Sequence, residues 1–253
     1  MPTVCTNLLC AQLSLGEIKK PSVINFIKGN YSAYVLGTLG CELFGFYDVY
    51  SKAKDPWISS LANQNIGQIM QFTREYLKKS TSPDTIKAYL AGIAVKRNVD
   101  KRLKGYLIHL TRLRKEASKE EISDRVCVVA DITFADPRTL AEELKKVPQG
   151  VYEAIEGLYI GYFEKTRREI LPPGLLKNCG DKLTEALEKR KPLMGAVGEY
   201  YYRSAVPNEE FRNSRREKWV NPLNEGETMM LGAEDLIRYA ARESARDICT
   251  IVS

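Results

Sequence analysis

The chain has 253 residues, of which 44% are hydrophobic and 28% are charged, and this composition is typical of a globular protein and excludes a disordered one. Its formal net charge of +6 is a mild excess, so only clustering of the bases can indicate an acidic partner. The apolar segment 4–15 follows no basic residue, and the most apolar segment, 31–50, holds two carboxylates, so neither a secretory signal nor a transmembrane anchor is expected.

The first predicted elements are helices. Apolar residues recur at helical spacing in 61–79, and again in 86–93. Between these segments, Ser82 is expected to cap the second helix, with Pro83 at its first position and Asp84 at the positive end of its macrodipole.

A separate basic helix is expected next, capped by Asn98 or Asp100 and ending near Ser118. β-branched residues then crowd together in 126–134, the segment VCVVADITF. No partner strand is evident elsewhere, and a lone strand cannot satisfy its backbone groups, so this segment is interpreted as a helix end and connector.

Helical spacing returns after Pro137, with Pro172, Pro192 and Pro207 as stops. The segment 220–227 is expected to be a loop, and the last helix to turn Leu236, Ile237, Tyr239 and Ala240 inward. The predicted helices are 138–146, 149–171, 175–191, 193–205, 209–219 and 233–248.

The predicted fold class is therefore all-α, with about ten helices in two lobes around a basic groove. The proposed domains are 1–125, an N-terminal helical lobe with the basic helix, and 126–253, a C-terminal helical lobe.

Catalytic and metal motifs are absent from the sequence. Six scattered cysteines form no CxxC pair, and the single histidine, His109, excludes most metal sites and nucleophile relays. No phosphate-binding loop is found, and the glycines of 36–46 are interpreted as sites of close helix packing. We therefore expect no enzymatic activity, no metal and no cofactor. Reduced thiols favour a cytoplasmic or nuclear compartment, or a virion if the protein coats a genome.

The basic helix is the strongest functional signal. Between residues 96 and 119 nine bases face only two acids, while Leu103, Leu107 and Leu110 keep helical spacing and are expected to be buried. A solvated face with an Arg112–Glu116 ion pair is the alternative. The bases predicted to bind a polyanion are Lys96, Arg97, Lys101, Arg102, Lys104, Arg112, Arg114 and Lys115.

Two further clusters extend this prediction. The first contains Lys165, Arg167 and Arg168, at the end of the long helix 149–171. The second mixes tyrosines with bases, as in proteins that stack unpaired bases on aromatic rings. Its predicted contact residues are Tyr201, Arg203, Arg212, Arg215 and Arg216.

The segment 71–114, with the motif SPDTIKAYL at 82–90, resembles the helical core-binding domain of tyrosine recombinases. In that family a catalytic arginine lies in a phrase similar to the TRREI at 166–170. No histidine follows His109, so the histidine-x-x-arginine of a working recombinase is missing. The resemblance implies a helical unit suited to nucleic acid and no recombinase activity.

The sequence thus predicts a non-enzymatic protein that binds single-stranded RNA or another polyanion, mainly through phosphate contacts. By analogy it resembles RNA-coating or packaging proteins, such as viral nucleoproteins or coat proteins, and the apolar ends 4–15 and 248–252 suggest exchange arms of a homo-oligomer. The alternative is a helical scaffold or matrix-type protein that binds partner proteins or an anionic membrane surface.

Overall fold

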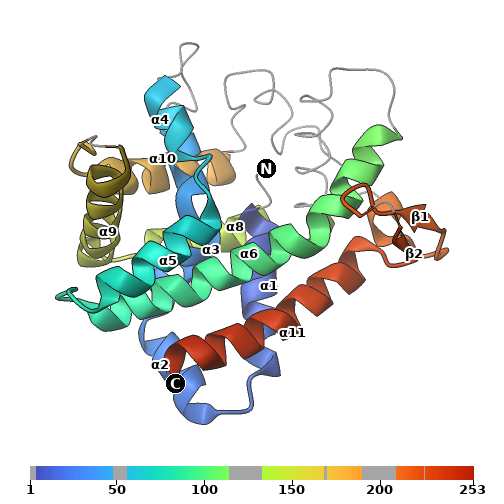
Figure 1. Cartoon of the computed structure of the whole chain (residues 1–253), viewed down its shortest axis with the longest axis horizontal. Coiled ribbons are helices and arrows are strands. Elements are labelled where there is room, and N and C mark those ends of the chain that lie inside the picture. The colour runs from blue at the N-terminus through green and yellow to red at the C-terminus, as the bar shows by residue number, and fades with distance from the viewer. Residues whose placement is uncertain (1–3, 48–55, 114–132, 168–169, 190–208, 225) are drawn as a thin grey trace.

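The computed structural model describes residues 4–47, 56–113, 133–167, 170–189, 209–224 and 226–253 (Figure 1). Most of these residues are helical, which confirms the predicted helical character. The strands seen among them are short, β1 (Trp219–Val220) and β2 (Thr228–Met229), which pair antiparallel around the predicted loop. No helix in the described parts of the chain is both long and apolar enough to cross a bilayer.

The N-terminal part forms a series of helices that leads to one long helix. The elements are α1 (Val4–Glu17), α2 (Pro21–Gly29), α3 (Tyr31–Leu39), the 3-10 helix η1 (Gly40–Phe46), α4 (Pro56–Leu61), α5 (Ile66–Leu77) and α6 (Pro83–Arg112). The predicted helix 61–79 is in fact divided, because Asn65 accepts hydrogen bonds from the Gly67 and Gln68 amides and starts α5 there.

Helix α6 corrects two sequence predictions. Pro83 and Asp84 lie in its first turn as expected, but the Ser82 side chain makes no capping hydrogen bond. The helix is 30 residues long and continues past Asn98 and Asp100 without a new cap at either. Asn98 is buried and donates to Asp247 at 2.9 Å and to Ser244 at 3.2 Å, so its amide ties two helices together.

The C-terminal part contains α8 (Pro137–Lys145), α9 (Gln149–Arg167), α10 (Leu175–Lys189), the 3-10 helix η2 (Glu209–Arg212) and α11 (Ala233–Val252). The predicted helix 209–219 is wrong, since only one 3-10 turn forms before β1. Tyr239 also departs from its predicted inward position, because 45% of it is exposed. The segment 126–132 and the predicted helix 193–205 lie outside the described residues.

Helix α6 runs through the centre of the molecule, and α11 lies beside it in the opposite direction (Figure 1). Buried residues from Val4 to Ile248 belong to one hydrophobic cluster. Elements from both sides of residue 125 therefore share a core, and the predicted domain boundary itself falls in 114–132, outside the described residues.

Two glycines allow α3 to cross α6 at backbone contact. A Cβ atom on Gly37 would lie 2.2 Å from the Tyr89 carbonyl oxygen, and one on Gly92 would lie 2.2 Å from the Tyr34 carbonyl oxygen. This crossing confirms close helix packing for one of the glycines in 36–46. Gly40 has another role, because its φ of +55° reverses the chain between α3 and η1.

A buried carboxylate from α9 caps α10. Glu156 accepts hydrogen bonds from the Gly174 amide at 2.8 Å and from the Leu176 amide at 3.0 Å, and only 7% of it is exposed. These amides lie at the start of α10, where the helix supplies no partners of its own and its dipole favours a negative charge.

We expect Glu156→Gln to lower the free energy of unfolding by about 1.5–3 kcal/mol. The glutamine side chain has one neutral acceptor oxygen, which makes a weaker hydrogen bond than a carboxylate. Its NH2 group would face the second backbone N–H and cannot accept from it. Urea denaturation measures this difference. Glu164→Gln, on the exposed face of the same helix, is the matched control and should be nearly neutral. Equal stability of the two variants would contradict the role of Glu156 as a cap.

Candidate nucleic-acid interface

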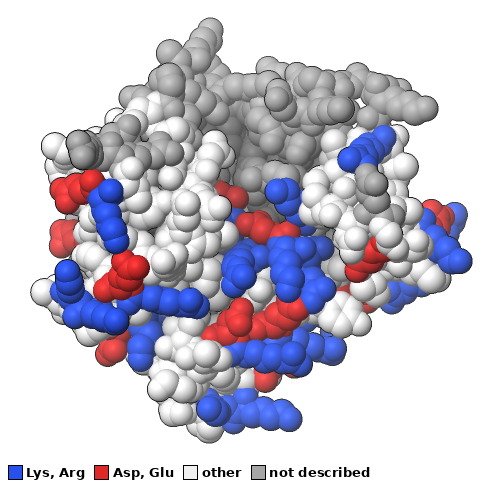
Figure 2. Space-filling view, viewed as in Figure 1, with Lys and Arg blue, Asp and Glu red and all other residues white. Residues whose placement is uncertain are grey.

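One face of α6 presents four exposed bases, Arg97, Lys101, Lys104 and Arg112, which we call the basic stripe. Their spacing of four, three and eight residues keeps them on one side of the helix, and they span about 22 Å along its axis. Figure 2 shows blue side chains gathered over the middle of the molecule, where α6 runs. The basic stripe is the longest row of predicted contact residues that lies on one surface of the structure.

The opposite face of α6 anchors the basic stripe in the core. Leu103 and Leu107 are 1% and 2% exposed, and Leu110 is 5% exposed, as predicted. Lys101 and Lys104 are exposed, also as predicted, whereas Arg102 is only partly so. The positions of the charged head groups are therefore set by a buried helix and not by a loop.

Most of the basic stripe carries charge that no acid in the described parts of the chain neutralises. Arg97, Lys104 and Arg112 make no ion pair with any residue that the structure describes. Lys101 lies 3.6 Å from a carboxylate oxygen of Glu243 on α11, and 60% of its side chain is exposed. Three of the four bases thus remain available to an external anion.

Arg102 is bound to α11 instead of facing solvent alone. Its guanidinium donates to both carboxylate oxygens of Glu243, from Nε at 3.1 Å and from Nη2. Hydrogen bonds from Arg102 lower the pKa of Glu243, so this carboxylate stays charged. The acids that lie near Arg102 in the sequence do not include Glu243, because Glu243 is 141 positions away.

Lys96 is a correction, since its predicted role at the surface is wrong. It is 2% exposed, and its ammonium lies 2.7 Å from Glu42 and 3.1 Å from Asp100. Burial opposes the charge, but the two carboxylates outweigh it and raise the pKa of Lys96. Lys96 therefore binds η1 to α6 and cannot meet an external phosphate.

Helix α11 adds bases that the sequence analysis did not select. Arg238, Arg242 and Arg246 recur every four residues on its exposed face. Arg238 pairs with Glu234 at 3.1 Å, and Arg242 lies 3.7 Å from Glu17. Arg246 makes no ion pair within the described residues. The i, i+4 repeat in 238–246 is the sequence signal that could have found them.

Carboxylates separate the two groups of bases. Glu243 and Asp247 lie where α11 meets α6, and each binds an α6 side chain. Figure 2 shows red groups between blue ones in this region. The surface is therefore a mixed one with an excess of bases, and we call it the α6–α11 face.

The Lys165 cluster is separate from the α6–α11 face. Lys165 is exposed on α9, pairs with Glu75 at 3.0 Å and lies over the Phe72 ring at 5.6 Å. Helix α9 lies at the far left of Figure 1, away from the basic half of α6. Lys165 and the basic stripe therefore do not lie side by side, and their joint border of one groove stays a prediction. Arg168 and the side chain of Arg167 lie outside the described residues.

The aromatic-basic cluster is also changed by the structure. Phe211 and Trp219 are buried, at 0% and 4% exposure, so neither ring can stack on a base. Arg212, Arg215 and Arg216 are exposed, and Arg216 pairs with Asp235 on α11. Four further predicted site residues lie outside the described part of the chain: Arg114, Lys115, Tyr201 and Arg203.

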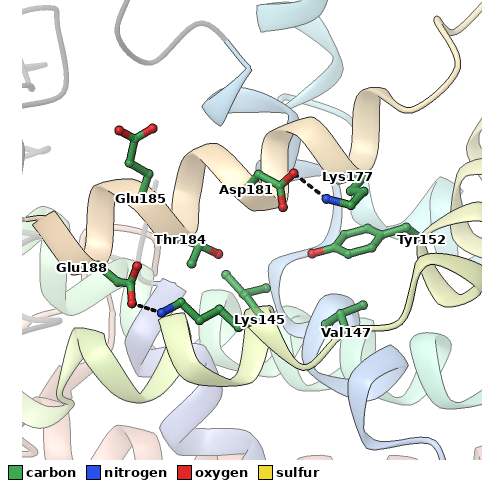
Figure 3. A pocket seen from close by; sticks show the side chains of 9 residues that line it. Lys145, Val147, Tyr152, Lys177, Asp181, Thr184, Glu185 and Glu188 are labelled. Carbon is green, nitrogen blue, oxygen red and sulfur yellow. Dashed lines mark hydrogen bonds and ion pairs between the residues drawn. The ribbon is translucent and has the colours of Figure 1, made fainter.

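A pocket of about 400 Å³ lies between α8 and α10 (Figure 3). Leu144 and Val147 contribute apolar surface, and the Tyr152 ring extends into the space between the two helices. Each charged group around it has a partner: Glu185 pairs with Lys182, which does not line the pocket, at 4.0 Å, and the other groups pair with one another. These pairs are Lys145 with Glu188, and Lys177 with Asp181 at 2.6 Å. The pocket therefore presents no unpaired charge to a ligand.

His109 and the carboxylates do not form a metal centre in the described residues. His109 lies against Trp219, with ring centroids 5.5 Å apart, and burial together with the nearby Arg112 lowers its pKa. No group of three or more histidine, cysteine, aspartate or glutamate side chains converges in the described parts of the chain.

Of the described surfaces, the α6–α11 face is therefore the candidate interface. The resemblance to recombinases is limited to the sequence of the segment 71–114 and its motif at 82–90. Comparisons with protein-family models, with curated proteins and with solved structures find no match for this chain.

Proposed function

We propose that this chain is a non-enzymatic RNA-binding protein that takes single-stranded RNA or a similar polyanion on the α6–α11 face. The observation that carries the proposal is the basic stripe, in which Arg97, Lys104 and Arg112 have no acidic partner within the described residues. A coating or packaging role, with several copies of the chain along one strand, is the form of this function that we favour.

Phosphate binding follows from the electrostatics of the basic stripe. Unpaired cations held along one helix raise the local potential, which attracts a polyanion and releases its condensed counterions. Arg97 and Arg112 can also donate two parallel hydrogen bonds to one phosphate, which Lys104 cannot. Binding of this kind is expected to depend on salt and to discriminate poorly between sequences.

The test is a triple charge reversal, Arg97→Glu, Lys101→Glu and Lys104→Glu. Arg102 is kept, because reversing it would place two carboxylates against each other at Glu243. Fluorescence anisotropy with a labelled single-stranded RNA should show affinity falling by at least about 100-fold, since attractive contacts become repulsive. In the parent protein the slope of log K against log salt should be about −0.7 for each phosphate contact.

The matched control reverses the same number of charges away from the basic stripe, at Arg74, Lys78 and Lys79 of α5 and its end (Figure 1). These bases are exposed and make no ion pair within the described residues. The control should retain most of the affinity. Equal losses in the two triple variants would show that net charge alone drives binding, and would overturn the assignment to the α6–α11 face. A protein-like ratio of absorbance at 260 and 280 nm after nuclease-free purification, with no binding at low salt, would overturn RNA binding itself.

A second candidate function is a scaffold or matrix-type protein on an anionic membrane. The observation that favours it is Leu113, which follows Arg112 directly and is 64% exposed. An apolar side chain beside bases can enter a lipid interface while the bases meet headgroups. Sedimentation with phosphatidylserine vesicles, compared between the parent and Leu113→Ser, tests this candidate. Vesicle binding that Leu113→Ser weakens, without RNA binding, would favour it.

A further inference from the structure

Tyr239 is an exposed aromatic residue on the α6–α11 face, and we propose that it is the platform on which an unpaired nucleic-acid base stacks. This inference rests on the proposed function and narrows its ligand to a single strand. A base inside a duplex is already stacked on both faces and cannot offer a face to a side chain.

The position of Tyr239 is unusual for its helix. Its neighbours Leu236, Ile237 and Ala240 are at most 2% exposed, whereas Tyr239 is 45% exposed. It is also the one exposed aromatic residue among the residues that the structure describes, where the other aromatic rings are buried or partly buried. This exposed ring therefore lies on the same surface as the lysine and arginine side chains that have no acidic partner among the described residues.

One arginine lies beside the Tyr239 ring, and two more are held one helical turn to either side of it. The Arg242 guanidinium carbon lies 6.0 Å from the ring centroid, at the limit of a cation–π contact. One turn before Tyr239, Asp235 holds Arg216, and one turn after it, Glu243 holds Arg102. Asp235, Tyr239 and Glu243 recur every four residues along α11, so both ion pairs lie on the side of the helix that carries Tyr239.

The two ion pairs hold the arginines in place and leave some of their N–H donors available. A guanidinium has five N–H donors, and a carboxylate takes at most two or three of them. The side chain of Arg216 is 52% exposed and that of Arg102 is 35% exposed, so further donors face solvent. The carboxylates that hold them, Asp235 and Glu243, each lie four residues, about 6 Å along α11, from Tyr239.

This arrangement matches one nucleotide of a single strand. The base covers the Tyr239 ring, and the phosphates on its two sides meet Arg102 and Arg216. Lys101 on the basic stripe shares Glu243 with Arg102, so the strand can continue from Tyr239 onto α6. Phosphates supply most of the attraction, and the ring adds a preference for unpaired bases over other polyanions.

The test compares Tyr239→Ala with Tyr239→Phe on three probes. These are a fluorescein-labelled RNA of about twelve nucleotides without secondary structure, the same RNA annealed to its complement, and inorganic polyphosphate as a competitor. Tyr239→Ala is expected to weaken single-strand binding roughly 5- to 150-fold, which corresponds to the loss of one base–aromatic stack. Duplex and polyphosphate affinities should stay within about twofold of the parent, and Tyr239→Phe should bind the single strand like the parent.

Met230→Ala is the control variant, because Met230 is 46% exposed but has no aromatic ring. It should change none of the three affinities. If Tyr239→Ala disturbs the fold, as judged by its unfolding midpoint, Tyr239→Leu removes the ring while it keeps a large side chain and a strong helix former.

The outcomes separate this inference from the proposed function. Equal weakening of single-strand and polyphosphate binding, or no change in Tyr239→Ala, overturns base stacking and leaves phosphate binding intact. Absence of binding to every probe by the parent protein overturns the proposed function itself. Selective loss of single-strand affinity in Tyr239→Ala and Tyr239→Leu, with Tyr239→Phe unchanged, supports the inference.

Discussion

Replacing Lys96 with methionine is expected to lower the free energy of unfolding by about 3–5 kcal/mol. The Lys96 ammonium is buried and bridges Glu42 on η1 and Asp100 on α6. Methionine fills much of the same volume, so the loss would come from charge and not from a cavity. It takes away the ammonium that lies 2.7 Å from the Glu42 carboxylate, whose side chain is only 16% exposed, so a largely buried charge loses its Lys96 partner.

Urea denaturation of matched variants measures this effect. Lys104→Met, on the exposed side of the same helix, should change the stability by no more than about 0.5 kcal/mol. Glu42→Gln added to Lys96→Met should recover part of the loss, because it removes the carboxylate charge that Lys96 no longer offsets. The double-mutant cycle gives the coupling free energy between the two residues. Lys96→Met with the stability of Lys104→Met would show that the buried ion pairs contribute little.

Gly92→Ala is expected to destabilise the protein by about 3 kcal/mol, although alanine is the better helix former. The new Cβ atom would lie 2.2 Å from the Tyr34 carbonyl oxygen and 2.7 Å from the Gly37 Cα atom. Both neighbours are backbone atoms, so no side-chain rotation can relieve the overlap. Helices α3 and α6 would have to move apart, which disturbs the buried residues packed around their crossing.

Gly161→Ala is the matched control for this prediction. Gly161 lies within α9, and a Cβ atom there would meet its nearest neighbour, Phe72, at an ordinary 3.5 Å. This substitution should stabilise the protein by up to about 1 kcal/mol through helix propensity alone. The two variants are thus expected to shift the thermal midpoint in opposite directions. A stabilising effect of Gly92→Ala would mean that the α3–α6 crossing is not closely packed.

These stability predictions separate the core from the surface along α6. Lys96 and Arg97 are neighbours in the sequence, yet one holds η1 in place and the other faces solvent. Loss of RNA binding in a Lys96 variant would therefore report on folding. Loss of binding in the Arg97, Lys101 and Lys104 variant, with an unchanged unfolding midpoint, would report on the surface.

Local signals were sufficient to predict several elements. Pro137, Gln149, Leu175 and Ala233 begin helices within one residue of the predicted positions. Proline at a first turn, and apolar residues every three or four positions, act within a few residues and can be read from a single chain. Where a tertiary contact competes, the local signal failed. Asn98 resembled a cap but is a buried tie to α11.

The sequence by itself determined the helical class and the division of α6 into an apolar face and a charged face, because both follow from the 3.6-residue period of one helix. The tertiary structure decided which bases remain available. Lys96 is neutralised from η1, and Arg102 from α11, by acids that lie far away along the chain. It also turned Tyr239 outward, on a surface to which α6, α11 and the segment before β1 each contribute an arginine. Charge compensation and exposure depend on distances in space, and chain folding brings together residues that no local pattern relates.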